Sequence, residues 1–144
     1  MSDIEERSFP TELLNKRIKS TVSLHGWKFE DIPQVINTCR ESGLAILDGK
    51  TEFFLPDDTF ELYWLRVRLT LKTPEESWEQ FVERTCNEFY PFFKEFYETT
   101  DFEKEALHSF DAIKKKKEAG INILDYLCFE LGIISESRYL TLFR

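Results

Sequence analysis

Residues 44–71 read LAILDGKTEFFLPDDTFELYWLRVRLTL, and this stretch decides the fold class. Three runs in it are rich in apolar, β-branched and aromatic residues, at 44–47, 51–55 and 60–71. Such runs are typical of β-strands. The Asp48-Gly49 pair indicates a two-residue hairpin, and residues 56–58 indicate a second turn. The stretch therefore predicts a three-stranded antiparallel β-meander.

The third run changes its alternation. Phe60, Leu62 and Trp64 share one phase, whereas Leu65 and the later apolar residues share the other. A β-bulge between Trp64 and Leu65 would keep one face buried throughout. Alternatively, both faces of the strand are covered. The pattern leaves these two interpretations open.

Helical signals lie on both sides of the strands. Capping residues and apolar spacing predict helices over about 10–25, 31–42, 73–96, 100–117 and 122–133. In the third of these, Thr73 is the expected cap, Glu76 completes a capping box, and Pro91 predicts a kink or break. The apolar tail, 138–143, fits either a strand or a helical turn. We therefore predict an α+β fold in one domain (1–144, with 1–7 a flexible tail): two N-terminal helices, the meander, then three C-terminal helices packed on the sheet.

The acidic charge is concentrated in one segment. The 144 residues include 19 basic and 27 acidic residues, for a net charge of −8, and residues 73–112 alone carry 3 basic and 11 acidic residues. Nucleic acid is an unlikely partner for such a chain, because phosphate binding needs clustered lysine and arginine. A basic protein fits better. Glu75, Glu79 and Glu83 recur every four residues and predict an acidic row on one helix face, which is either a partner site or an ordinary solvated surface.

The search for chemistry finds no nucleotide-binding, metalloprotease or nucleophile-elbow motif, so no cofactor or metal is expected. Cys39, Cys86 and Cys128 are far apart in the sequence, and we predict buried, reduced thiols on apolar helix faces. No apolar run is long enough to span a membrane, and the acidic start differs from a secretory signal. A cytoplasmic location is therefore expected. Tyr63 and Trp64 belong to an aromatic-rich hairpin and are residue types enriched at binding hot spots.

In size, acidity, aromatic content and lack of a catalytic motif, the chain resembles small bacterial immunity proteins and other inhibitor modules. That resemblance is one of character and assigns no role to any residue. It favours a binding or inhibitor protein that contacts a basic partner. One alternative is a small-molecule-binding domain or enzyme with a pocket between meander and helices, motivated by the aromatic residues and by Arg66 and Arg68. Another is a homo-oligomeric structural domain that pairs through a strand edge or the apolar tail. The oligomeric state is left open.

Overall fold

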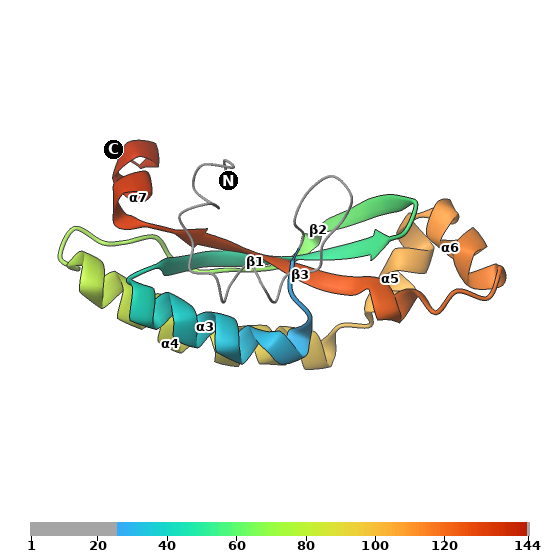
Figure 1. Cartoon of the computed structure of the whole chain (residues 1–144), viewed down its shortest axis with the longest axis horizontal. Helices are drawn as coiled ribbons and strands as arrows, with labels where there is room; N and C mark the ends of the chain where they lie inside the picture. Colours follow the sequence, from blue (N-terminus) through green and yellow to red (C-terminus); the bar gives the residue numbers. More distant parts are fainter. Residues whose placement is uncertain (1–25, 144) are drawn as a thin grey trace.

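The computed structural model describes residues 26–143, in which helices cover one face of a three-stranded antiparallel sheet (Figure 1). The elements in chain order are η1 (Phe29–Asp31), α3 (Ile32–Ser42), β1 (Ala45–Leu55), β2 (Asp58–Arg68), α4 (Trp78–Thr99), α5 (Phe102–Ser109), α6 (Asp111–Glu118), η2 (Ile123–Tyr126), β3 (Leu127–Ile134) and α7 (Glu136–Leu142). Helices α3 and α4 run side by side beneath the sheet, α5 and α6 lie at one end of the molecule, and α7 lies at the other. The helix predicted over 10–25 and the tail 1–7 lie outside the described residues.

The α+β class and the antiparallel sheet are confirmed, but the meander is wrong. The strand order is β2-β1-β3, so the last strand in the chain pairs with the central one. The runs predicted as two strands, 44–47 and 51–55, form the single strand β1, and the hairpin turn lies between β1 and β2. Asp48-Gly49 is therefore inside the central strand.

Gly49 has a packing role that explains why no turn forms there. A Cβ atom on Gly49 would lie 2.7 Å from Cζ of Phe89 and 3.2 Å from Cε1 of Phe93. These rings belong to α4, which crosses the sheet at this point. The glycine lets the helix approach the central strand closely. Close approach of another element is a common reason for a glycine within a strand.

The predicted helix over 122–133 is also wrong. Only Ile123–Tyr126 forms a short 3-10 turn, and the chain then continues as β3. Leu127, Phe129 and Leu131 pair with Phe53, Thr51 and Gly49 of β1. Most of β3 is buried on both faces, so its sequence is an almost continuous apolar run. Such a run does not distinguish a buried strand from a buried helix.

An irregularity in the pairing of β2 with β1 explains why the apolar alternation changes phase between Trp64 and Leu65. Lys50 pairs with Arg66, but the next residue, Thr51, pairs with Leu62. Residues 63–65 of β2 therefore have no partner in β1, and the hydroxyl of Thr51 donates a hydrogen bond to the carbonyl oxygen of Leu65 at 2.9 Å. The bulge interpretation is confirmed.

The helix α3 matches its prediction closely. Pro33 lies in the first turn, and the helix ends at Gly43, whose φ of 69° is in the left-handed region that favours glycine. The helix α4 begins later than predicted, at Trp78. Its cap is Ser77, which forms a reciprocal capping box with Gln80.

Residues 73–76 instead form a turn in front of α4. The backbone amide of Thr73 donates to the Glu76 carboxylate at 3.0 Å, so the expected residues do contact each other outside the helix. The predicted break at Pro91 does not occur, because α4 continues to Thr99. Pro91 and Asn87 are exposed, so the carbonyl that the proline leaves without its helical donor lies on the solvent side.

The predictions for residues 100–117 and for the tail 138–143 are both made more specific by the structure. The helix expected over 100–117 is divided into α5 and α6 at Phe110, whose backbone is extended (φ −134°, ψ 110°). Its ring packs on Phe60 of β2, at 5.1 Å between centroids. The tail forms the helix α7, capped by the hydroxyl of Ser135.

The core lies between the sheet and the helices α3 and α4, and it is dominated by aromatic rings. The fully buried large side chains include Trp27, Phe53, Phe81, Phe89, Phe93 and Phe129. Trp78 is half-buried, and its indole N–H donates to the Gly43 carbonyl oxygen at 2.8 Å. The opposite edge of β3 receives Trp27, whose backbone exchanges two 2.8 Å hydrogen bonds with Phe129.

Candidate functional site

The bulge in β2 places two large aromatic side chains on the surface. Tyr63 is 65% exposed and Trp64 is 43% exposed. Their rings meet edge to face at 5.3 Å, and the indole of Trp64 also stacks on Phe110 at 6.3 Å. Bulges commonly reorient side chains in this way next to functional sites. The aromatic pair is therefore held in place from beneath yet remains accessible.

A surface hollow lies directly beside this pair, and we call it the bulge hollow. It has a volume of about 500 Å³. It is lined by Leu65, Thr99, Thr100, Asp101, Lys104, Glu105 and His108. Leu65 is the third residue of the bulge, so the hollow and the aromatic pair are adjacent along β2. The other wall comes from the end of α4 and from α5.

Asp101 and Glu105 give the bulge hollow two carboxylates. Asp101 caps α5, and its carboxylate accepts a 3.0 Å hydrogen bond from the backbone amide of Lys104. Glu105 follows one helical turn later and is half-buried. Lys104 and His108 bring basic groups to the same wall. The hollow thus has one apolar lining residue, Leu65, and a mixed polar wall, and it is next to two exposed aromatic residues along β2.

The predicted acidic row is not a single helix face. Glu75 precedes α4, because the helix begins at Trp78, and only Glu79 and Glu83 are on the helix. All three are exposed. Glu83 lies 3.8 Å from Arg40 of α3 and accepts a 3.2 Å hydrogen bond from Asn87. The negative charge of Glu83 is therefore partly neutralised within the protein, by Arg40.

The structure does not bring the acidic row next to the aromatic pair. Leu65 lines the same hollow as Thr99, which is at the far end of α4. Sixteen residues of helix separate Glu83 from Thr99, which corresponds to about 24 Å. Asp101 and Glu105 are the nearer acidic residues, and the sequence analysis did not single them out for function. Asp101 is the cap of α5, and nothing in the sequence places it beside residues 63–65.

A second cluster, around Arg84, has a structural role. Its guanidinium group contacts the Glu76 carboxylate at 2.6 and 3.0 Å and Glu88 at 3.2 Å, and it donates to the carbonyl oxygens of Thr70 and Leu71. The hydrogen bonds from Arg84, followed by the one from the Thr73 amide, lower the pKa of Glu76 to about 2. The cluster joins the connection after β2 to the start of α4.

This pKa shift predicts a pH dependence of stability. The folded-state pKa of Glu76 is depressed from its usual 4.5, so its stabilising effect is complete above that value and is lost as the pH falls toward 2. We expect Glu76→Gln to have a smaller loss of unfolding free energy than the wild type between pH 5 and pH 2, measured by urea denaturation. Arg84→Met should flatten the same part of the curve. Parallel curves for wild type and Glu76→Gln would contradict the assignment.

The three cysteines are buried and free of disulfides, as predicted, although Cys128 lies on β3 and not on a helix. Burial raises the pKa of every one of these thiols, to about 11 for Cys86 and about 12 for Cys128, and well above its usual range for Cys39. Because the thiolate is the reactive form, these groups are inert in the folded protein.

Thiol labelling checks this directly. We expect slow modification of the native protein at pH 8 by a chromogenic disulfide reagent, and rapid modification of all three cysteines in denaturant. Cys86→Ser should leave the native rate unchanged, because the group is already unreactive. A fast native phase that this variant abolishes would instead identify Cys86 as a reactive site.

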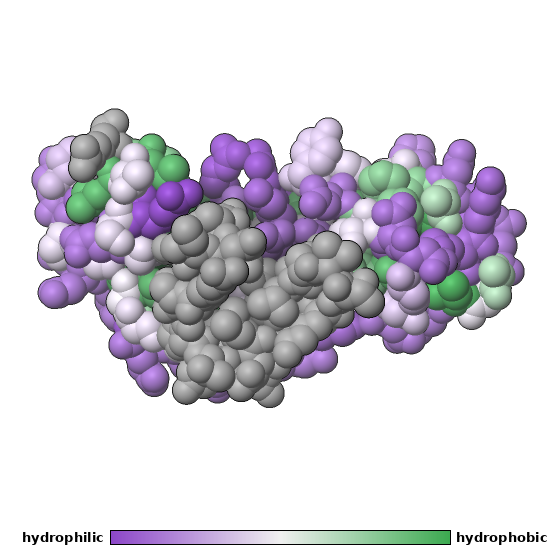
Figure 2. Space-filling view, turned by 45° about the horizontal axis from the view of Figure 1, so that its top comes forward, coloured by the Kyte–Doolittle hydropathy of each residue, from purple (hydrophilic) through white to green (hydrophobic). Residues whose placement is uncertain are grey.

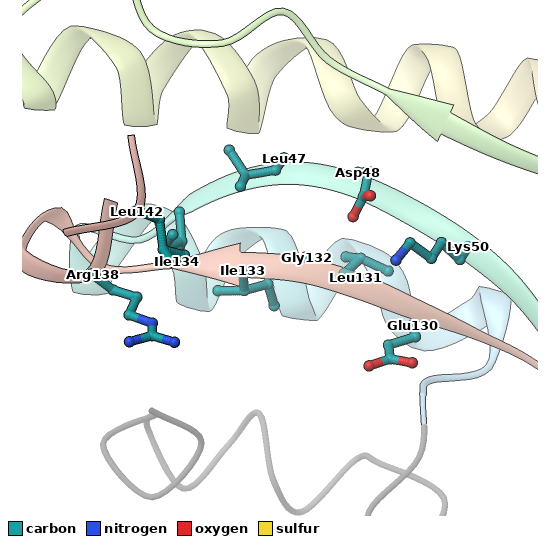
Figure 3. A pocket seen from close by; sticks show the side chains of 10 residues that line it. All are labelled: Leu47, Asp48, Lys50, Glu130, Leu131, Gly132, Ile133, Ile134, Arg138 and Leu142. Atoms are coloured by element: carbon teal, nitrogen blue, oxygen red, sulfur yellow. The ribbon is translucent and has the colours of Figure 1, made fainter. Parts of the chain in front are cut away.

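A second hollow lies on the face of the sheet that α3 and α4 do not cover, and we call it the sheet hollow (Figure 3). Its volume is about 210 Å³. It is lined by Leu47, Asp48, Lys50, residues 130–134, Arg138 and Leu142. The sequence-based alternative placed a pocket between sheet and helices, next to Arg66 and Arg68. This hollow is on the opposite face, and neither arginine lines it.

Hydrophobic side chains are also exposed at the α7 end of the molecule. Figure 2 shows apolar residues gathered there and at the α5–α6 end, with polar residues between them. The exposed apolar residues near α7 are Leu71, Leu140, Leu142 and Phe143. The apolar tail noted in the sequence is therefore only partly used for packing, through the stacking of Phe143 on Tyr139 at 4.6 Å.

The chain matches no protein-family model, no curated protein and no solved structure with which it was compared. Within residues 26–143, no helix is both long and apolar enough to cross a membrane. In the same range, no group of three or more histidine, cysteine or acidic side chains is arranged to hold a metal ion.

Proposed function

We propose that this protein is a binding or inhibitor module that acts by stoichiometric contact with a basic protein, through the surface formed by Tyr63, Trp64 and the bulge hollow. The observation that supports this most directly is the exposure of two adjacent aromatic side chains beside two carboxylates, Asp101 and Glu105. Aromatic residues next to a polar rim are the usual composition of a binding hot spot.

The charge balance supports a basic partner. Residues 26–143 carry 23 acidic and 14 basic side chains, and the segment that includes the bulge hollow is the most acidic part of the chain. Opposite charge speeds encounter and suppresses wrong partners. The Trp64 ring, stacked on Phe110, is already ordered and would lose little conformational freedom on binding. Glu75 and Glu79, which lie further away, would act only through this long-range attraction.

The first test compares three immobilised baits in a host lysate: the wild type, Trp64→Ala and Phe143→Ala. Phe143 is a similarly exposed aromatic residue at the α7 end, so it is the matched control. We expect a protein that is retained by the wild type and by Phe143→Ala but lost from Trp64→Ala. With that protein purified, calorimetry should give a 1:1 complex that Trp64→Ala weakens by about 30-fold or more, the size of a hot-spot loss. Thermal unfolding must show that the variant is folded.

The second test separates the two groups of acids. Asp101→Asn with Glu105→Gln should slow association and flatten its dependence on salt, because the removed charges lie beside the contact. Asparagine caps helices as well as aspartate does, so α5 should persist. The triple variant with glutamine at Glu75, Glu79 and Glu83 should have a smaller effect on the association rate. If the distal triple variant has the larger effect, the binding surface is at the start of α4 and this proposal is wrong.

A further inference from the structure

The sheet hollow has opposite charges at its two ends. Arg138, from α7, lies at one end, and Asp48, Lys50 and Glu130 lie at the other (Figure 3). Lys50 is paired with Glu130 in the register of β1 and β3, so the lining at this end includes one ammonium group and two carboxylates. Arg68 of β2 is opposite Asp48 but does not line the hollow. The two ends are separated by the length of β3 from residue 130 to residue 134, about 13 Å along the strand.

The floor between these ends is apolar. It includes Leu47, Ile133 and Ile134, with Leu142 of α7 beside them. In Figure 3 the guanidinium group of Arg138 and the carboxylate of Glu130 extend to the same side of β3. A molecule lying along the strand would therefore meet a cation, then an apolar surface, then the carboxylates of Asp48 and Glu130.

Arg138 has an unused hydrogen-bond donor. Within residues 26–143, its Nε atom is buried and has no hydrogen-bond partner. Buried polar atoms are nearly always satisfied, so an exception calls for an explanation. A guanidinium group binds a carboxylate through two parallel N–H donors, of which Nε is commonly one. A carboxylate in the hollow would supply the acceptor that this atom lacks once the Arg138 side chain turns to expose it.

Gly132 makes room for the Asp48 carboxylate at the acidic end of the hollow. A Cβ atom on Gly132 would lie 2.4 Å from Oδ1 of Asp48. The φ angle of Gly132 is not positive, so its backbone conformation does not demand glycine. The missing side chain instead leaves room for the Asp48 carboxylate on the surface of the sheet.

From these observations we propose that the sheet hollow binds a small ω-aminocarboxylate or a closely related zwitterion, with its carboxylate on Arg138, its methylene body on the apolar floor, and its ammonium group near Asp48 and Glu130. The site is separate from the bulge hollow, and the inference does not depend on the proposed protein partner. The class of ligand follows from the order of the charged groups along β3 and from the distance between them.

Three probes of similar length test the charge order: 6-aminohexanoate, hexanoate and hexylamine. Amide shifts in a ¹⁵N-labelled sample of the full chain give both the location and the affinity. We expect 6-aminohexanoate to bind about tenfold more tightly than either singly charged probe, because a charge-assisted hydrogen bond is lost in each case. The shifts should centre on Lys50 and Gly132. Equal affinity for hexanoate, or no shifts at the hollow at millimolar concentration, would overturn the proposal.

Variants then assign the two ends. Arg138→Gln should reduce the affinity for 6-aminohexanoate to that for hexylamine, and Asp48→Asn should reduce it toward that for hexanoate. Arg40→Gln is the control, because this arginine is on α3, which covers the other face of the sheet, and does not line the hollow. Chemical shifts distant from the hollow will show whether each variant is folded. An unchanged affinity in Arg138→Gln would refute the site.

Discussion

Phe93→Ala should lower the free energy of unfolding by about 3–5 kcal/mol, the usual cost of truncating a fully buried phenylalanine. Phe93 is completely buried on α4. Its ring packs face to face with Phe89 at 5.0 Å and edge to face with Phe129 of β3 at 4.9 Å. Phe29 also stacks on it, at 6.0 Å. The truncation would leave a cavity where the helix, the sheet and the N-terminal 3-10 turn meet.

The adjacent residue provides the control for this experiment. Phe92 is 51% exposed, so Phe92→Ala should change the free energy of unfolding by only about 0.5 kcal/mol. Both variants remove the same group from neighbouring positions of one helix, so their helix propensities change equally. Chemical denaturation at constant pH measures both. Similar losses for the two variants would mean that the face of α4 packed on the sheet has been misassigned.

Gly26→Ala is the second substitution with a large expected effect, about 3 kcal/mol, in the upper part of the range for overpacking. A Cβ atom on Gly26 would lie 2.0 Å from the backbone oxygen of Phe129 and 2.8 Å from the backbone nitrogen of Glu130. Backbone atoms within a sheet cannot move independently of their hydrogen bonds. The methyl group would therefore separate Trp27 from Phe129 and disturb the edge of β3.

Gly132→Ala is the matched control for Gly26→Ala, because its clash is with the flexible tip of Asp48. A rotation of that side chain relieves the contact, so the loss should be clearly smaller than for Gly26→Ala. Urea denaturation followed by tryptophan fluorescence is suitable for both, because Trp27 is next to the first site. If Gly26→Ala is as stable as Gly132→Ala, residues 26 and 27 do not pack on β3 as described.

The elements with local signals were predictable from the sequence. The cap at Gly43 and the apolar spacing of Ile32, Val35 and Ile36 gave α3 almost to the residue. The aromatic spacing of residues 81–93 identified the buried face of α4, although its start was misplaced by the Thr73–Glu76 contact. That contact exists but belongs to a separate turn, so a capping pattern alone does not fix where a helix begins.

The errors in the sheet arise from contacts distant in sequence. Asp48-Gly49 resembles a turn because local preferences favour one there. The decisive contact of Gly49 is with Phe89, forty residues later. Residues 127–134 form a strand only because β1 offers them a free edge to pair with. Neither partner can be inferred from local composition.

Only the part of the candidate site that depends on a local pattern was predictable from the sequence. The phase change at Trp64 pointed to a bulge, and the bulge exposes Tyr63 and Trp64. Asp101 and Glu105 could not be found, since only the tertiary fold brings them to the same hollow as Leu65. Charge counting drew attention to segment 73–112, which includes Asp101 and Glu105, but it singled out Glu75, Glu79 and Glu83 at the other end of that segment.

The strand order β2-β1-β3 also affects how the chain folds during its synthesis. The hairpin of β1 and β2 is local, but β3 follows β1 by about seventy residues. At 5–20 residues per second, a ribosome needs on the order of 4–15 s to make the intervening chain. During that time the edge of β1 that later binds β3 has no permanent partner, and exposed strand edges promote aggregation. The nascent chain is therefore most in need of chaperone protection between completion of the hairpin and emergence of residue 134.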